Sequence, residues 1–442
     1  MTGVAAAADW AWAEIIAVGS ELLVPPRVDT NSIFISDALN AIGIQVRAKA
    51  IVGDRRGDLA AVFREALART PLVILCGGLG PTDDDLTRDA VADVLGLPLE
   101  EHAGVLERIR QRFAHRARPM PDVNRRQALV PRGAVVIPNE QGTAPGLWIE
   151  RAQQIVILLP GPPGELKPMF SRIAEDRLAV LAGAERVYRR TLRLCGRTES
   201  EVEQVAFPIY SAWMTGPVPI ETTVLTAPAQ IELHLTVRSA SEPAAAARLD
   251  AAVAQLRVEL GDDVFSVDGR PLEVVVGEGL RRKGWRVAAA ESCTGGLLSS
   301  RLTDVPGSSD YVVANAVCYS NESKTSWLGV PPATIADHGA VSEPVAMAMA
   351  EGIRRRTGVE IGVGVTGIAG PTGGSESKPV GTVAVAVVTA DARVVRTYRF
   401  PGGRLRVKQF ASQMALDMIR RVVDGCEVSG AFVVRPSQEL RG

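Results

Sequence analysis

Histidine is scarce in this sequence, and it is scarcest in the last third. The chain has 442 residues and four histidines, and only His338 lies beyond residue 268. A serine nucleophile in that region would have one histidine to use as its base, and otherwise the base must be another residue type. The five cysteines are scattered without the paired spacing of a zinc site, which predicts reduced thiols in a cytoplasmic protein.

Long basic runs and long apolar runs are also absent. The net charge is −1, so we expect no strong nucleic-acid binding, since nucleic-acid-binding domains are usually basic. No uncharged segment reaches the length of about 20 apolar residues that a membrane helix needs. The first apolar stretch meets Asp9 and Glu14 and lacks the basic start of a signal peptide. We therefore expect no membrane partner and a cytoplasmic location.

The overall composition, with 46% hydrophobic and 22% charged residues, is typical of a globular protein. The length suggests two or three domains. Strand and helix patterns alternate through the first 180 residues and again from residue 271. Between these regions, a β-α-β-α order indicates a smaller module. We therefore predict an α/β protein in which two three-layer α/β domains, 12–182 and 268–430, flank a small α+β module at 185–267.

The clearest strand pattern is the nearly all-apolar run "PLVILCGGLG" at 71–80, typical of a strand buried on both faces of a parallel sheet. Further strands are predicted at 13–19, 45–54, 134–138, 154–161, 186–196, 229–239, 285–292, 309–320 and 361–370, with a hairpin at 381–400. Helices are predicted at 31–43, 57–70, 85–95, 101–117, 199–210, 242–261, 271–284 and 406–425.

The stretch "AAAESCTGGLLSS", residues 288–300, places Ser292 and Cys293 where a predicted strand turns into a helix. Ligands of α/β proteins gather at such strand ends, and the amides of Thr294, Gly295 and Gly296 at the helix start could hold an oxyanion or a phosphate. Small residues with Thr294 as a cap would equally explain a tight structural turn. Adjacent strand residues point to opposite faces, so only one of Ser292 and Cys293 can face a site, and spacing does not say which.

Two residues could serve as a base for Ser292. His338 lies in "ADHGAVSEP", a predicted loop in which helix capping or surface exposure is an equal alternative. Lys324 lies in "CYSNESKTSWLGV", just after a predicted strand, although most lysines are solvated surface residues. A free lysine has a pKa of about 10.4, so it would need burial to act as a base at neutral pH. A further glycine-rich loop, "VGVTGIAGPTGG" at 363–374, lies at another predicted strand end.

The first domain carries a comparable set of strand-end loops. "CGGLGPTDDDLTRDAVADVLG" at 76–96 offers glycine amides for an anion and three consecutive aspartates for a cation such as Mg²⁺. Aspartates at a helix start are the structural alternative, because the helix dipole stabilises them. Together with "LLPGPPGELKPMF" at 158–170 and "VGSELLVPPRVDTNS" at 18–32, this loop suggests cation-assisted handling of a phosphate or pyrophosphate.

These segments resemble one family, in order and over about residues 12–430. "GGLGPTDDDLTRDAVA" and "LPGPPGE" are similar to the molybdopterin-binding-like domain of the CinA family, the competence/damage-inducible proteins. "AAAESCTGGLLSSRLTDVPGSS", "CYSNESKTSWLGV", "HGAVSE" and "VTGIAGPTGGSESKPVGTV" are similar to its C-terminal nicotinamide-nucleotide amidohydrolase domain. The resemblance also implies a KH-like fold for the middle module, a homodimer, and pyridine nucleotides as small-molecule partners.

For the C-terminal domain, the resemblance implies deamidation of nicotinamide mononucleotide to nicotinate mononucleotide, a step of pyridine nucleotide salvage that needs no cofactor. Ser292 would be the nucleophile and Lys324 the general base. The substrate-binding residues that it implies are Thr294, Gly295, Gly296, Tyr319, Thr366, Gly367 and Gly370.

For the N-terminal domain, the resemblance implies an ADP-ribose pyrophosphatase that needs a divalent, Mg-like cation, with K⁺ as a further ion and with Asp84 and Asp85 as metal ligands. The implied site consists of Gly77, Gly78, Gly80, Asp84, Asp85, Thr87 and Glu165. Two alternatives remain open: this pyrophosphatase is the main activity, or the protein is a non-catalytic binding protein. Against nucleic acid as its ligand, "CGRTES" at 195–200 is not the GXXG loop that clamps the backbone in KH domains.

Two segments depart from the family pattern. "ELLVPPRVDTN" carries Pro25 and Pro26 where the family usually has a glycine shortly after "ELL", which stiffens this loop. "GGRLRVKQ" has Gly403 in place of an acidic residue and Lys408 in place of a later arginine. These exchanges alter the groups that can contact an anion, but they leave Ser292 and Lys324 unchanged.

Overall fold

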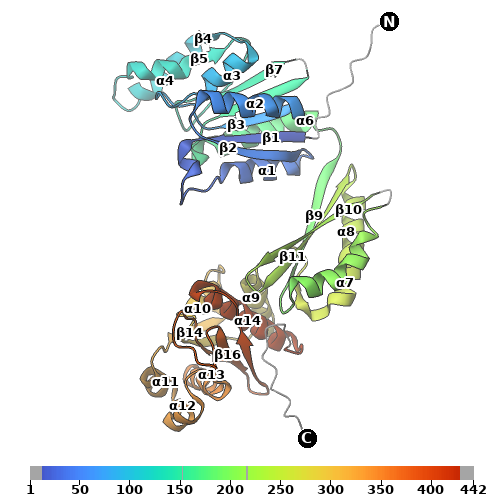
Figure 1. Ribbon diagram of the computed structural model, residues 1–442, viewed down its shortest axis with the longest axis vertical. Helices are drawn as coiled ribbons and strands as arrows, with labels where there is room; N and C mark the ends of the chain where they lie inside the picture. The colour runs from blue at the N-terminus through green and yellow to red at the C-terminus, as the bar shows by residue number, and fades with distance from the viewer. Residues whose placement is uncertain (1–11, 152, 216–217, 429–442) are drawn as a thin grey trace. The chain divides into compact units, whose positions relative to one another are not determined.

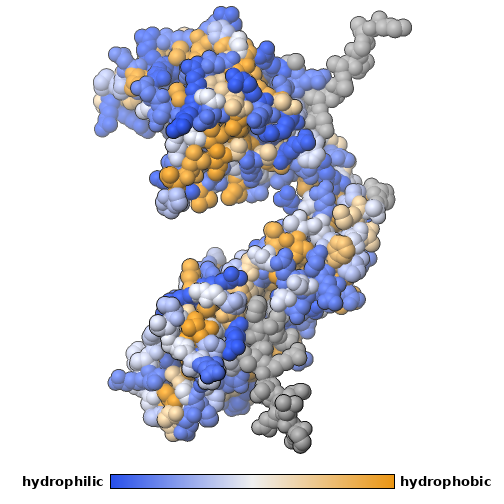
Figure 2. All heavy atoms as spheres, in the orientation of Figure 1, coloured by the Kyte–Doolittle hydropathy of each residue, from blue (hydrophilic) through white to orange (hydrophobic). Residues whose placement is uncertain are grey.

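The computed structural model describes residues 12–151, 153–215 and 218–428 (Figure 1). The chain forms two compact units, Met1–Tyr188 with Arg238–Ala245, and Arg189–Val237 with Ala246–Gly442. Among the described helices, none is both long and apolar enough to cross a membrane. Figure 2 shows hydrophilic residues interspersed with hydrophobic patches on the visible face of each unit. The fold is mixed α/β, as predicted, whereas the three domain boundaries stay a prediction.

The first unit is built on a six-stranded sheet in the order β2-β1-β3-β8-β7-β6. Four adjacent strands run parallel: β1 (Trp12–Val18), β2 (Gln45–Val52), β3 (Leu72–Cys76) and β8 (Gln154–Leu159). The next strand, β7 (Gly146–Arg151), pairs antiparallel with β8 and with the edge strand β6 (Val135–Ile137). Every residue of β3 is buried, which confirms the prediction from its apolar run. A separate two-stranded sheet pairs β4 (Leu99–Glu101) with β5 (Leu129–Pro131).

Helices cover both faces of this sheet (Figure 1). Alternate residues of β1 enter two different cores, because side chains of a strand alternate between faces: Ile16 packs with one and Ile15 with the other. The first core contains α2 and α3, and the second contains α1 and α5. The helices of this unit are α1 (Asn31–Ala41), α2 (Arg56–Arg69), α3 (Thr87–Leu95), α4 (Ala103–Ala114), α5 (Pro163–Ile173) and α6 (Ala179–Leu181).

The middle of the chain forms a four-stranded sheet in the order β10-β11-β9-β12. Its strands are β9 (Arg186–Leu194), β10 (Ile220–Ala227), β11 (Gln230–Ser239) and β12 (Val264–Ser266), with helices α7 (Glu199–Ser211) and α8 (Glu242–Leu260). The sequence predicted β-α-β-α and missed β10 and β12. The reason for β10 is physical: most of its side chains are exposed and several are threonines, so it lacks the apolar alternation that reveals β11.

The C-terminal sheet has the order β14-β13-β15-β16-β17. The strands β13 (Val287–Glu291), β14 (Val312–Val317) and β15 (Ile361–Gly367) are parallel, and β16 (Thr382–Val388) with β17 (Arg393–Arg399) form the predicted antiparallel hairpin. The helices around this sheet are α9 (Leu272–Lys283), α10 (Leu297–Thr303), α11 (Asn321–Leu328), α12 (Pro332–His338), α13 (Glu343–Thr357) and α14 (Arg404–Asp424).

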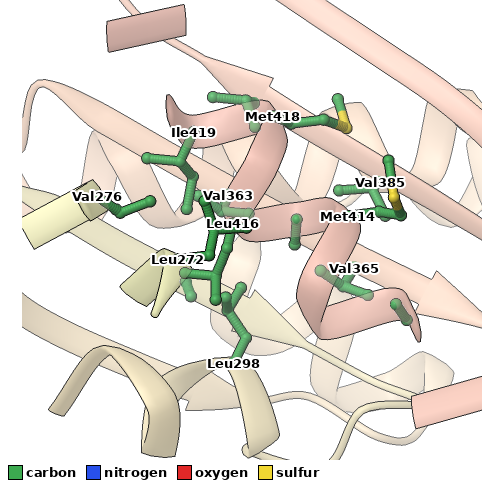
Figure 3. Packing of buried hydrophobic residues seen from close by; sticks show 14 of the residues in the cluster. Leu272, Val276, Leu298, Val363, Val365, Val385, Met414, Leu416, Met418 and Ile419 are labelled. Carbon is green, nitrogen blue, oxygen red and sulfur yellow. The ribbon is translucent and has the colours of Figure 1, made fainter. Parts of the chain in front are cut away.

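One face of this sheet packs on α9 and α14, where Met414 and Met418 lie among the valines of the strands (Figure 3). The other face packs on α13. Because β13, β14 and β15 are parallel, their carboxyl ends lie at one edge of the sheet. The loops that follow these three strands are therefore brought together.

A buried ionic cluster ties α14 to the segment before β12, within the second unit. The Asp417 carboxylate is 1% exposed and accepts hydrogen bonds from Arg420 at 2.7 Å and from Arg421 Nε at 2.8 Å. Arg421 Nη2 also donates to Asp263, and Arg420 donates to the Asp262 carbonyl at 2.7 Å. Such buried ions hold a defined geometry, because separating them would leave charge without a partner in the interior.

Candidate active site

Ser292 and Lys324, which lie 32 positions apart in sequence, meet at the carboxyl edge of the C-terminal sheet. Ser292 directly follows β13, and its Oγ lies 3.2 Å from Lys324 Nζ. Ser292 is 7% exposed and Lys324 is 2% exposed. Lys324 is positioned by α11, whose start is capped by Ser320 through a 3.1 Å hydrogen bond from the Ser323 amide. The pair has the arrangement of a nucleophile beside a base.

The surroundings of Lys324 favour its neutral form. Burial lowers the pKa of Lys324, because a charged ammonium loses its hydration in the interior. Its only other hydrogen bond within the described residues goes from Nζ to the Tyr319 carbonyl at 3.0 Å. A neutral amine has a lone pair that can accept the proton of the Ser292 hydroxyl, so the pair can perform general-base chemistry.

The two alternatives to this pair fit the geometry less well. Cys293 is 4% exposed, and burial raises the pKa of its thiol to about 12, so the nucleophilic thiolate is scarce near neutrality. Its thiol packs on Gly367, where an added Cβ would lie only 2.9 Å from Cys293 Sγ. His338 ends α12 and is not among the residues that line the pocket. The arrangement points to Ser292 and Lys324.

A pocket opens beside the pair, and three of the predicted binding residues line it: Tyr319, Thr366 and Gly367. Thr366 is 1% exposed and holds the neighbouring loop by donating to the Ala340 carbonyl at 2.8 Å. The other lining residues are Ser292, Cys293, Asn321, Lys324, Ala340, Val341, Ala369 and Arg404.

Of these, Asn321, Ala340, Val341, Ala369 and Arg404 were not predicted. Four of them lie inside motifs that were recognised in the sequence, so adjacency to the motif residues was the available signal. Arg404 had a weaker signal, its place in "GGRLRVKQ". It donates to the Tyr319 hydroxyl at 2.8 Å, which a sequence pattern cannot show.

The other four predicted binding residues do not line the pocket. Thr294 is fully buried, and its hydroxyl has no hydrogen-bond partner among the described residues. Gly295 and Gly296 form the turn after Ser292 with φ of 60° and 91°, a conformation that favours glycine. The Gly370 carbonyl accepts a hydrogen bond from Arg404 at 3.0 Å. These residues lie in the loops beside the pocket and do not line it.

Glu291 has a role that sequence reasoning missed. Its carboxylate is fully buried and accepts hydrogen bonds from the amides of Gly296 at 3.0 Å, Leu298 at 3.1 Å and Ser299 at 2.8 Å. The Ser299 hydroxyl donates to the same carboxylate. The side chain that precedes Ser292 therefore caps α10 and ties it to the end of β13.

This cap corrects one expectation. The Gly296 amide was expected to help hold an oxyanion or a phosphate at the start of α10, but it is already engaged by a carboxylate. A second anion beside that carboxylate would be repelled. Glu291 does not use the amides of Cys293 and Thr294, which come directly after Ser292.

The first unit has its own pocket, at the carboxyl ends of β1, β3 and β8. Of the predicted residues, Gly77, Gly78, Gly80, Asp84, Asp85 and Glu165 line it. Thr87 does not, because its buried hydroxyl donates to the Gly77 carbonyl at 2.8 Å and so supports the glycine turn from behind. Gln127 and Thr143 also line the pocket, and they come from segments without a recognised motif.

The aspartates in and beside this pocket already interact with other residues of the protein. Asp85 accepts from the Gly80 amide at 2.7 Å and from the Thr82 amide at 2.9 Å, which closes the glycine loop. A hydrogen bond from Thr82 lowers the pKa of Asp84, and Asp83 pairs with Arg126. The described residues include no group of three or more His, Cys, Asp or Glu that could hold a metal ion. Asp84 and Asp85 could therefore supply only some of the ligands of a cation. Water and a bound phosphate would supply the others, as is common for Mg²⁺.

Comparisons with known proteins cover both units. The CinA C-terminal domain matches residues 269–423, and a probable molybdopterin binding domain matches residues 14–180. A CinA-like protein from Koribacter versatilis is 47% identical over 413 residues, which cover 92% of this chain and 99% of that protein. A CinA-like protein from Solibacter usitatus is 44% identical over 413 residues, covering 93% and 98%. The crystal structure of the competence/damage inducible protein CihA from Agrobacterium tumefaciens is 37% identical, covers 35% of this chain and 93% of its own, and has a TM-score of 0.34.

The Glu291 cap predicts a stability effect. Glu291→Gln keeps the shape of the side chain but presents an NH₂ group to amide donors, so we expect the free energy of unfolding of the second unit to fall by about 1–3 kcal/mol. Chemical denaturation measures this. Glu322→Gln, an exposed exchange in the first turn of α11, is the control and should change stability by less than about 0.5 kcal/mol. Equal losses in the two variants would contradict the role of Glu291.

Proposed function

This chain belongs to the CinA family, and on that premise we propose that its second unit is a nicotinamide mononucleotide deamidase. The enzyme would hydrolyse the carboxamide C–N bond to give nicotinate mononucleotide and ammonia, in pyridine nucleotide salvage. The observation that supports this most directly is the 3.2 Å contact between Ser292 Oγ and the buried amine of Lys324. We further propose that the protein acts in the cytoplasm as a homodimer.

In the first step of the proposed mechanism, neutral Lys324 accepts the proton of the Ser292 hydroxyl as Oγ attacks the carboxamide carbon. A C–O bond forms and the carbonyl oxygen becomes an oxyanion. The amides of Cys293 and Thr294 are proposed to hold this oxyanion, because they follow the nucleophile directly and are not engaged by Glu291. Hydrogen bonds that form only to the oxyanion lower the barrier without tightening substrate binding.

In the second step, the Lys324 ammonium returns its proton to the amide nitrogen, the C–N bond breaks and ammonia leaves. An acyl ester of Ser292 remains. Lys324, again neutral, then takes a proton from a water molecule that attacks the ester carbon, and the proton returns to Ser292 Oγ as the carboxylate product departs. One buried lysine thus serves both half-reactions, which requires that its resting state be neutral.

Removal of the nucleophile provides the first test of this mechanism. Ser292→Ala leaves no oxygen to form the acyl ester, so ammonia release from nicotinamide mononucleotide should fall by at least about 10³-fold. Cys293→Ala should retain turnover, because the buried thiol takes no part. A coupled ammonia assay measures both rates. If Ser292→Ala stays active while folded Cys293→Ala is inactive, the nucleophile is the thiol.

The pH dependence provides a second test. Only neutral Lys324 can act as the base, so ammonia release should rise with pH as this amine loses its proton. Because burial lowers the pKa of Lys324, the midpoint of this rise should lie below the value of about 10.4 for a free lysine. Initial rates across a neutral to alkaline pH series measure it. A rise that vanishes in His338→Gln, with Lys324→Met still active, would assign the base to His338 instead.

A second proposed activity belongs to the first unit, an ADP-ribose pyrophosphatase. The pocket at the ends of β1, β3 and β8 supports it, because glycine turns and carboxylates surround it. Asp84 and Asp85 would hold a divalent cation together with the phosphates of the substrate, and the cation would supply charge neutralisation of the pyrophosphate.

This second activity predicts AMP release from ADP-ribose that is lost on chelation. Asp84→Asn should lower the rate, because the exposed carboxylate that faces the pocket would no longer attract the cation. Asp83→Asn is the control: Asp83 pairs with Arg126 and does not line the pocket, so its variant should behave as the parent does. Chromatography of the products measures AMP. Turnover that persists with chelator present would argue against a cation-dependent pyrophosphatase.

A further inference from the structure

The strand β14 forms one edge of the C-terminal sheet, and its outer side has no neighbouring strand among the described residues. Its sequence, VVANAV, contains no charged residue and no proline. Two of its valines are exposed to solvent, Val313 to 46% and Val317 to 52%. An edge strand leaves a row of backbone N–H and C=O groups unpaired, so β14 combines free backbone groups with exposed apolar side chains.

The other long edge strands carry charged residues. Within the described part of the chain, the edge strands of six or more residues are β2, β10, β14 and β17. Arg47 and Lys49 lie on β2, Glu221 lies on β10, and β17 contains three arginines. Proteins place charge on a free edge because it prevents pairing with other chains. Of these four strands, only β14 lacks such a residue.

Most of β14 is regular enough to accept a further strand. Its pairing with β13 continues in register from Ala314 to Val317, and the one irregularity lies before Ala314. Asn315 is the only polar residue of the strand, and its side-chain oxygen accepts a hydrogen bond from the Ala289 amide of β13 at 3.0 Å. This side chain is therefore engaged within its own sheet, so it does not take the place of a charged residue in keeping other strands away.

We propose that β14 pairs antiparallel with β14 of a second copy of this chain, which joins two five-stranded sheets into one sheet of ten strands. Around a two-fold axis a strand meets itself, so a charged residue near the axis would lie beside its own like charge. The arginines of β17 and the basic residues of β2 disfavour such pairing, whereas β14 presents no charge to its copy. The inference names a surface for the proposed homodimer and depends on no step of the proposed chemistry.

A charge placed on this edge tests the surface. Val313→Lys brings an ammonium from each copy to the paired strands, so the dissociation constant of the dimer should rise by at least about tenfold. Light scattering during gel filtration, over a dilution series, measures it. Ile51→Lys is the matched control, because Ile51 is 42% exposed on the edge strand β2, and this variant should stay as dimeric as the parent. Val313→Thr keeps a β-branched, uncharged residue and should stay dimeric too.

The spacing of strands gives a second, independent measurement. Arg393, on the opposite edge strand β17, lies level with Ala314 through the register of the intervening strands. In a sheet of ten strands the two copies of Arg393 lie nine strand spacings apart, about 40 Å. Spin labels on Arg393→Cys should therefore show a separation of about 35–50 Å by pulsed electron resonance. The variant also carries Cys426→Ser, because Cys426 is the one native cysteine that is not buried.

The outcomes separate this inference from the proposed deamidase. A dimeric parent, a monomeric Val313→Lys variant with unchanged thermal unfolding, and labels within the expected range would support the surface, whether or not ammonia is released. A monomeric parent would overturn the surface, and ammonia release by that monomer would leave the deamidase standing. If folded Val313→Lys stays as dimeric as Ile51→Lys, or if the label separation falls outside the expected range, the two copies associate through another surface and the inference is wrong.

Discussion

The proposed chemistry depends on an amine kept out of water beside a serine hydroxyl. An ammonium in the interior is costly, and this cost is what shifts Lys324 toward the neutral form that can accept a proton. The cost is partly offset because the Tyr319 carbonyl accepts one N–H of the amine, while α11 positions the side chain. The same burial that makes the lysine a base also makes it dependent on the packing of the whole unit.

That packing places Ser292 and Lys324 together through the topology of the sheet. Three adjacent parallel strands end at one edge, so the turn after β13, the end of β15 and the helix after β14 contribute Ser292, Thr366 and Lys324 to one pocket. Glu291 then fixes the turn behind Ser292 by capping α10. The helix α14 packs on the face of the sheet opposite α13 (Figure 3). Its first residue, Arg404, also lines the pocket. One helix thus belongs both to the hydrophobic core and to the lining of the candidate active-site pocket.

The first unit applies the same topology to different residues. Its pocket also lies at the ends of parallel strands, but one of its acidic residues, Asp85, is engaged in closing the glycine loop. A cation there would complete its coordination with groups from the ligand, so metal binding and phosphate binding would be coupled. Pro25 and Pro26 lie just before Arg27 and Asp29, which line this pocket, so the departure from the family pattern lies at the edge of the site itself.

The strands with strong apolar patterns, the helices between them and the residues at the strand ends were predictable, because hydrophobic periodicity and glycine-rich turns are local signals. The scarcity of histidine directed attention to Lys324, and the motifs indicated Ser292. Other features depend on contacts between distant segments, which no local pattern records. The exposed strand β10 has no apolar alternation, Glu291 bonds to amides up to eight positions away, and Arg404 enters a pocket 112 positions from Ser292 in the chain. Local spacing does not say which of Ser292 and Cys293 faces the lysine. The family resemblance implied Ser292, and the folded turn places Ser292 Oγ 3.2 Å from Lys324 Nζ.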